Sequence, residues 1–152
     1  MSEPVVERIM QAVRSRVAAV RTSYRSTNIA TWQVKDNVLH VHQGDIAENP
    51  EMDCPGNPPA KGWTVVAAIA AILKPSDTDA TPIDTYKNRA WATIVQAVTD
   101  ADLWHQWGGL AVNSTIGPIE DFTAEDGSGS GVFVRISIHF RTDENNPYNV
   151  RA

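Results

Sequence analysis

Residues 132–141 alternate between apolar and mostly polar side chains, and no other feature of the sequence constrains the fold as strongly. Successive side chains of a β-strand point to opposite faces of a sheet, so the alternation predicts a strand with one face in a core. The apolar set is Val132, Val134, Ile136, Ile138 and Phe140, and the opposite set is Phe133, Arg135, Ser137, His139 and Arg141. Such a strand needs further strands beside it and an apolar layer over its inner face.

Other segments supply the neighbouring strands. Residues 63–74 form a nearly continuous apolar run, which predicts a long buried strand, although the alanines would also permit a helix. Residues 30–34 and 38–43 are rich in β-formers and predict a hairpin. Residues 110–122 predict a strand that is interrupted by a bulge, or lies at an edge, at the Gly-Pro pair 117–118.

Two segments have the periodicity of amphipathic helices. The first covers residues 2–24, with Ser2 as its cap, and the second begins at Thr81–Pro82 and ends near Asp100. The first apolar stripe is Val6, Ile9, Met10, Val13, Val17, Val20 and Tyr24, and the second is Ile83, Tyr86, Ala90, Trp91, Ile94 and Val98. The chain of 152 residues therefore predicts one α+β domain, a mainly antiparallel sheet packed on one face by two amphipathic helices.

Composition argues against several classes of function. The net charge is −5 and no run of Lys or Arg is long enough to make a nucleic-acid patch, which argues against tight binding of nucleic acid. Cys54 is the single cysteine, so a disulfide within the chain is impossible and a reducing compartment is expected. The apolar run 63–73 is shorter than the roughly 20 residues of a membrane span, and the charged start of the chain does not resemble a signal peptide.

The sequence offers little for catalysis. It contains no nucleophile elbow and no glycine-rich phosphate loop of a known kind. The strongest chemical candidate is the pair His40 and His42, which would project from one face of a strand as metal ligands can, with His139 or Asp45 completing a site. Because a His-x-His pair is a weak signal, a solvated sheet face is the favoured interpretation, and neither a metal nor a catalytic residue is predicted.

Candidate contact residues lie in two polar loops and in the tryptophans. The loop 44–62 contains Asn57, Pro58 and Pro59, and the hairpin tip 125–131 contains Asp126, Ser128 and Ser130. Loops of this kind are expected to order only against a partner. Trp104 and Trp107 either cap the core or anchor an interface, whereas Trp63 and Trp91 are expected in the core. The polar tail 143–152 is expected to be partly mobile.

The order of these pieces resembles that of the tail terminator and tail-completion (neck) proteins of tailed bacteriophages. The matching features are a leading amphipathic helix, Gly-Asn-Pro-Pro-Ala at 56–60 before a long apolar strand, Pro-Ser-Asp at 75–77, a helix with Trp91, Ile94 and Val98, Gly-Gly at 108–109, a Gly/Ser-tipped hairpin, and Arg141-Thr142 followed by Asn146-Pro147-Tyr148. The resemblance covers nearly the whole chain, and each of its motifs is short and structural.

The resemblance implies a ring-forming subunit, commonly in six copies, with no catalytic residue and no cofactor. Such a ring ends the tail tube at its final length and faces the head, so the implied partners are further copies of the chain, the tail tube protein and the head–tail connector or stopper protein. DNA would only pass through the ring, where six copies would carry roughly −30 (six times −5) and repel it. The implied location is the tail or neck of the virion, away from any membrane.

Three alternatives remain open. The first is a head-closure or tail-completion factor that acts on the portal side. The second is a small metal-dependent enzyme that uses His40 and His42, and the third is a monomeric binding module. The length of tails assembled without the chain distinguishes the first alternative from a terminator, and elemental analysis of the purified protein tests the second. The mass of the protein in solution separates the third from a ring.

We expect the loop 44–62 and the hairpin tip 125–131 to contact the tail tube or the connector. Deleting residues 126–130 should then leave the fold intact and block head–tail joining, because a glycine- and serine-rich tip contributes little to a core. Circular dichroism checks the fold, and a plaque assay checks joining. Normal infectious particles from the deletion would contradict the assignment of this tip.

Overall fold

The computed structural model describes residues 3–19, 23–25, 39–73, 82–123 and 130–151. These residues form the helices α1 (Val5–Ala18) and α2 (Ile83–Thr99), the short 3-10 helices η2 (Pro50–Met52) and η3 (Trp104–Gly109), and the strands β1 (Ser23–Arg25), β2 (Leu39–Glu48), β3 (Ala60–Leu73), β4 (Asn113–Thr123), β5 (Ser130–Asp143) and β6 (Asn146–Val150). The sheet has the order β1-β2-β3-β5-β4, and β6 pairs with β5 outside this path. Among the described pairings only β1 with β2 is parallel, so the predicted α+β class is confirmed.

The centre of the sheet is the antiparallel pair β3 and β5. The two strands are in register from Ala60 opposite Asp143 to Leu73 opposite Ser130. The apolar set predicted for residues 132–141 is buried, and it faces the buried residues of β3 across the same side of the sheet. From β3 this side presents Val65, Ala67, Ile69 and Ala71. Both predicted strands are confirmed. The run is apolar on both faces of β3 because Ala68 and Ala70 are also buried, against Phe133, on the face away from the helices.

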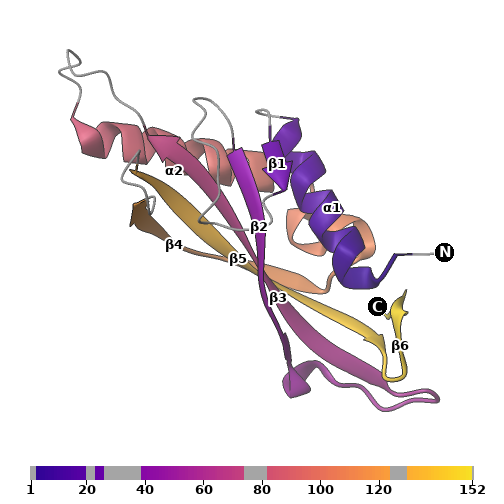
Figure 1. The fold of residues 1–152 in the computed structure, drawn as a ribbon. Coiled ribbons are helices and arrows are strands. Elements are labelled where there is room, and N and C mark those ends of the chain that lie inside the picture. The colour runs from indigo at the N-terminus through magenta and orange to yellow at the C-terminus, as the bar shows by residue number, and fades with distance from the viewer. Residues whose placement is uncertain (1–2, 20–22, 26–38, 74–81, 124–129, 152) are drawn as a thin grey trace.

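Both helices cover this same side of the sheet, as predicted (Figure 1). The residues they bury in the common core are Val5, Ile9, Met10, Val13 and Val17 from α1, and Ala90, Ile94 and Val98 from α2. The predicted extent of the first helix is wrong, because α1 ends at Ala18 and Tyr24 lies in β1, where it pairs with His40. Pairing with β2 overrides the helical periodicity at this point. Pro4 stands at the N-cap of α1, and Ser2 and Val20 lie outside the described residues.

The strands are much longer than the helices that cover them. β3 and β5 have 14 residues each, which at about 3.3 Å per residue corresponds to about 46 Å. α1 has 14 residues and α2 has 17, which at about 1.5 Å per residue correspond to about 21 and 26 Å. One end of the sheet therefore extends beyond the helices, at the bottom of Figure 1. We call this end, residues 46–65 and 138–151, the arm.

Several boundaries differ from the prediction. β2 continues to Glu48 and β3 begins at Ala60, so the predicted loop 44–62 shrinks to residues 49–59 with η2 inside it. The predicted partner strand 30–34 lies outside the described residues, and β2 pairs with β1 and β3. β4 is an edge strand with an irregular register between Ile116 and Ile119, which confirms the predicted interruption at 117–118.

Arg16 connects α1 to the segment that follows α2. Its Nη1 atom donates hydrogen bonds to the carbonyl oxygens of Val98 and Trp104, both at 2.9 Å, and its guanidinium carbon lies 3.9 Å from the centre of the Trp107 ring. Burial lowers the pKa of Arg16, but an arginine side chain stays charged in proteins. The guanidinium therefore gives a hydrogen-bond partner to the Val98 carbonyl in the last turn of α2 and to the Trp104 carbonyl at the start of η3, and it stacks on an aromatic face.

Trp107 is held in a strained backbone conformation at the same place. Its φ is 51°, in the left-handed region that costs a non-glycine residue about 1–2 kcal/mol, and Gly108 and Gly109 follow with φ of 70° and 90°. The indole Nε1 donates a 2.8 Å hydrogen bond to Ser114 Oγ, which in turn donates to the carbonyl oxygen of His105. Burial of the indole, this hydrogen bond and the Arg16 contact offset the strain.

We predict that Arg16→Ala lowers the free energy of unfolding by about 2–4 kcal/mol, because it removes two charge-assisted hydrogen bonds and a cation–π contact. Arg16→Lys should recover only part of this loss, since an ammonium cannot stack as a planar guanidinium does. Arg89→Ala, at an exposed position of α2, is the matched control. Urea unfolding measures all three variants, and equal losses for Arg16→Ala and Arg89→Ala would contradict the role of Arg16.

Candidate interaction surface

The connection between β2 and β3 is ordered by the chain itself. Asn49 N donates to the Gly62 carbonyl at 2.9 Å, and Gly62 N donates to Asp53 Oδ1 at 2.7 Å. A side chain at position 62 would collide with Asn49 O and with the Met52 side chain, so this close approach requires glycine. Arg141 Nε also donates to Met52 O at 2.7 Å. The prediction that this loop orders only against a partner is therefore wrong, because its polar groups find partners within the arm.

Asn57, Pro58 and Pro59 lie in this connection, close to the C-terminal residues of the arm. The Asn57–Pro58 peptide bond is cis, and Pro58 O accepts a 3.0 Å hydrogen bond from Arg151 Nη1. Pro59 O accepts a 2.9 Å hydrogen bond from Glu144 N. The side chains of Asn57 and Pro59 are exposed and that of Pro58 is half-buried. The carbonyl groups of Pro58 and Pro59 thus accept hydrogen bonds within the arm. The role of the three residues as contact residues stays a prediction.

The C-terminal residues fold back onto the sheet instead of forming the predicted mobile tail. β6 pairs with β5, with Val150 opposite Thr142. Asp143 is nearly buried and accepts hydrogen bonds from Asn149 Nδ2 at 2.9 Å and from Arg151 Nη1 at 2.8 Å. The hydrogen bonds from Asn149 and Arg151 lower the pKa of the Asp143 carboxyl. The polar residues that suggested a mobile tail therefore include an ion pair within the arm, between Arg151 and Asp143.

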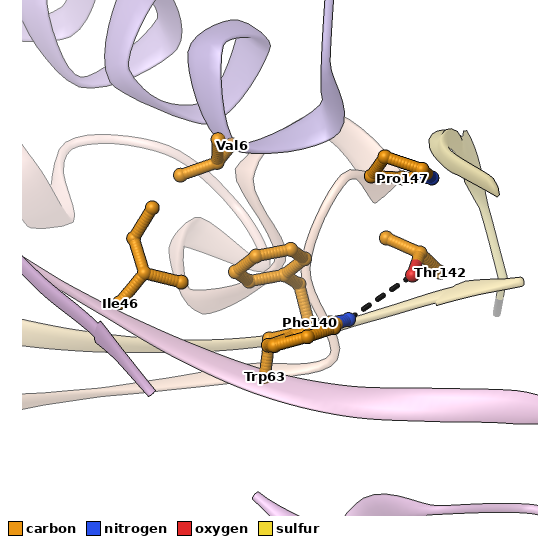
Figure 2. A pocket seen from close by; sticks show the side chains of 6 residues that line it. All are labelled: Val6, Ile46, Trp63, Phe140, Thr142 and Pro147. Carbon is orange, nitrogen blue, oxygen red and sulfur yellow. Dashed lines mark hydrogen bonds between the residues drawn. The ribbon is translucent and has the colours of Figure 1, made fainter. Parts of the chain in front are cut away.

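The arm contains an apolar groove on the side of the sheet that carries the helices (Figure 2). Its volume is about 140 Å³, and the residues that line it are Val6, Ile46, Trp63, Phe140, Thr142 and Pro147. We call this set the arm groove. Trp63 Nε1 donates a 3.1 Å hydrogen bond to Thr142 Oγ1, so the polar atom of the indole is satisfied and the remaining wall is largely apolar. Ile46 is 45% exposed, and Tyr148, next to Pro147 in β6, is 41% exposed.

The predictions for the tryptophans have mixed outcomes. Trp107 is 1% exposed and belongs to the core, so an interface role for it is wrong, while Trp104 is half-buried and packs against the same core. Trp63 also packs against the core and lines the arm groove. The core prediction for Trp91 is wrong, because this side chain is 44% exposed. It lies about 100° around α2 from the buried Ala90, at the margin of the apolar stripe.

The three histidines considered as metal ligands do not meet. His40 and His42 pair with Ala70 and Ala68, so they share the sheet face away from the helices, as predicted. His139 pairs with Thr64 on β5's side of β3, four residues from Ala68 or about 13 Å along the strand. His139 Nδ1 lies 2.8 Å from Thr64 Oγ1, and no group of three His, Cys, Asp or Glu in the described residues is arranged to hold a metal. Asp45 borders the same surface hollow as His42.

Two of the remaining candidates, Asp126 and Ser128, lie outside the described residues. Ser130 begins β5, and its backbone pairs with Leu73 and Thr123. Most of the predicted hairpin tip 125–131 therefore lies outside the described residues. Its proposed contact with other proteins stays a prediction.

Comparison of the sequence with models of known protein families and with curated proteins found no match. Neither helix of the described residues has an apolar stretch long enough to cross a bilayer. The function has to be inferred from the arm, the edges of the sheet and the exposed apolar side chains.

The lowered pKa of Asp143 predicts how the arm responds to acid. The ionised carboxylate should stabilise the folded chain above the ordinary pKa of 3.8, and this contribution should disappear as the pH falls through the lower folded pKa. Asp143→Asn should therefore be less stable than the wild type at neutral pH, and the difference should shrink below pH 3.8. Urea unfolding from about pH 7 down to about pH 2 measures this, because the contribution of a salt-bridged carboxylate is lost only below both of its pKa values. Glu144→Gln is the exposed control. A difference that does not vary with pH would contradict the ion pair.

Proposed function

We propose that this chain is a non-enzymatic structural protein of a tailed-phage virion. It forms a ring at the head-proximal end of the tail, where it caps the tail tube and joins it to the head connector. The observation that carries the proposal is the arm, a well-ordered end of the sheet that extends beyond the helices and keeps an apolar groove open to solvent. A solvent-exposed apolar groove on an ordered scaffold is typical of a surface that contacts another protein.

The fold agrees with the expectation that comes with the family resemblance. The tail terminator and neck proteins imply a sheet packed by helices, and the described residues form an antiparallel sheet with both helices on one face. The resemblance in sequence includes the segments that build the arm, since 56–60 leads into β3 and residues 141–142 and 146–148 belong to β5 and β6. These segments support the proposal because they supply the groove and its surroundings.

The edges of the sheet also suit a subunit that repeats around an axis. β4 forms one edge. On the opposite side β1 pairs with Leu39, His40 and Val41 of β2, and no strand among the described residues lies outside β2 beyond Val41. The two sides of the molecule are thus different surfaces. When one surface binds the other on a neighbouring copy, the copies form a closed ring if the rotation between successive copies returns to the first. A net charge of −5 per chain would keep DNA from adhering to such a ring.

Tails assembled in a host that lacks this chain test the proposal. We expect tail tubes of uncontrolled length without heads, because nothing would end tube polymerisation, and a plasmid copy of the wild-type chain should restore normal particles. Negative-stain electron microscopy measures the tube lengths. Tails of normal length that remain detached would instead identify a head-closure factor. Infectious particles of normal form, or virions without this protein, would refute a structural role.

A further inference from the structure

We propose that the arm accepts an extended segment of a neighbouring virion protein. The segment adds a strand to the edge of β2 at residues 46–48 and places an apolar side chain over the arm groove. The inference rests on the proposed function and names how the arm makes its contact. β2 runs along the arm in Figure 1, and Ile46 forms one wall of the groove in Figure 2. An open strand edge and an apolar pocket therefore meet at one residue.

The backbone of β2 in the arm points alternately toward β3 and away from it. Asn49 N donates a 2.9 Å hydrogen bond to Gly62 O, so residue 49 faces β3. Successive residues of an antiparallel strand alternate between the two directions. Ala47 therefore also faces β3, whereas Ile46 and Glu48 direct their N–H and C=O groups to the outside of the sheet. No strand of the described residues lies there to receive them.

This part of the β2 edge is ordered and open to solvent. Ile46 is 45% exposed, and Ala47 and Glu48 are also exposed, while β1 pairs with β2 at residues 39–41. An exposed strand edge is a template for pairing with another chain. Domains that bind peptides in this way use the main-chain hydrogen bonds for affinity and a pocket beside the edge for specificity. The arm supplies both features.

The arm groove determines which side chain the added strand carries. Ile46 pairs with Val65, which belongs to the core under the helices, so a residue paired with Ile46 on its other side would project over the same face. Cβ atoms of directly opposed residues lie about 4.5–5.5 Å apart, which brings that side chain to the groove. The groove has a volume of about 140 Å³, with Trp63 and Phe140 in its wall. An apolar cavity of about 150 Å³ accommodates a benzene ring, so a leucine or an aromatic side chain fits.

A second copy of the chain is a poor donor of this strand. The opposite edge of the described sheet is β4, and its register shifts between Ile116 and Ile119. Pro118, within this shift, has no N–H to donate, and Ser114 on the other side of it is only 5% exposed. A bulge and a proline interrupt the row of backbone groups that pairing needs. The occupant is therefore an extended segment of a different protein.

The contact is short, which suits a protein that must stay unassembled until its partners are present. Residues 46–48 extend about 10 Å, and the register shift of β2 between Gln43 and Ile46 ends the straight edge on one side. One such contact is weak by itself. A ring that presents several arms to the same structure multiplies it, because each contact raises the effective concentration of the next.

Glu48→Pro tests the backbone contact without removing a hydrogen bond inside the sheet. The proline lacks the outward N–H and its ring obstructs an added strand, while an edge position whose N–H faces solvent tolerates it. Glu48→Thr is the matched control, because it loses the same carboxylate and its 3.4 Å contact with Lys61 but keeps the N–H. Ile46→Gln removes the apolar neighbour of the incoming side chain. Circular dichroism and urea midpoints check that each variant folds.

In-vitro complementation measures the contact. Particles assembled in a host that lacks the chain are mixed with the purified protein, and plaque titre reports the restored joining. Glu48→Thr should act like the wild type. Glu48→Pro and Ile46→Gln should need at least about 30-fold more protein for the same titre, the loss expected for one hot-spot contact. Hydrogen exchange of the wild type should find the amides of Ile46 and Glu48 protected in the particle and unprotected in the free chain.

Wild-type activity of Glu48→Pro, or an equal loss for Glu48→Pro and Glu48→Thr, would overturn the inference. If Glu48→Pro fails to fold, the exchange of the wild-type amides decides, and unprotected amides of Ile46 and Glu48 in the particle would overturn it. Protection of these amides by self-association of the purified chain would identify a second copy as the occupant and would also overturn it. A wild-type chain that is absent from virions and restores no titre refutes the proposed function itself, whereas a failure confined to these variants leaves that function standing.

Discussion

The structure depends on a mismatch of length between the strands and the helices that cover them. Strands of 14 residues reach about twice as far as a 14-residue helix, since the rise per residue is about 3.3 Å in a strand and about 1.5 Å in a helix. α1 and α2 bury the apolar side of one end of the sheet and cannot cover the other. The apolar side of the sheet nevertheless continues into the arm, where Phe140 is buried and Ile46 is 45% exposed, so an apolar groove remains at the surface of the arm.

The sequence predicted the elements that are defined by periodicity. The alternation in residues 132–141 and the apolar run 63–74 identified the central strands, because the burial of a sheet face leaves a direct trace in the residue pattern. The ends of elements were less accurate: Tyr24 continues the helical spacing of α1, yet it pairs with β2. Such pairing between distant segments overrides local preference and leaves no signal in a short stretch of sequence.

The candidate surface was only partly predictable. Trp91 matched the apolar stripe of α2, but a residue at the margin of a stripe is buried only where something covers that side, and this depends on where the sheet ends. The arm groove brings together residues from four strands and α1, so no spacing along the chain identifies it. The polar tail looked mobile because Asp143 and Arg151 pair only after β6 has folded back. A signal was present at Gly62, where a glycine within a strand marks the close approach of η2.

The account predicts that the arm contacts a neighbouring protein in an assembled ring. A subunit with two different surfaces on opposite sides of one sheet can repeat around an axis without leaving a free end. The most direct measurement is a density map of the assembled particle from electron cryomicroscopy. The account predicts a closed ring of this chain at the end of the tail tube, with each arm groove covered by an adjacent protein. An arm groove that is open to solvent in every copy, or a particle without such a ring, would contradict it.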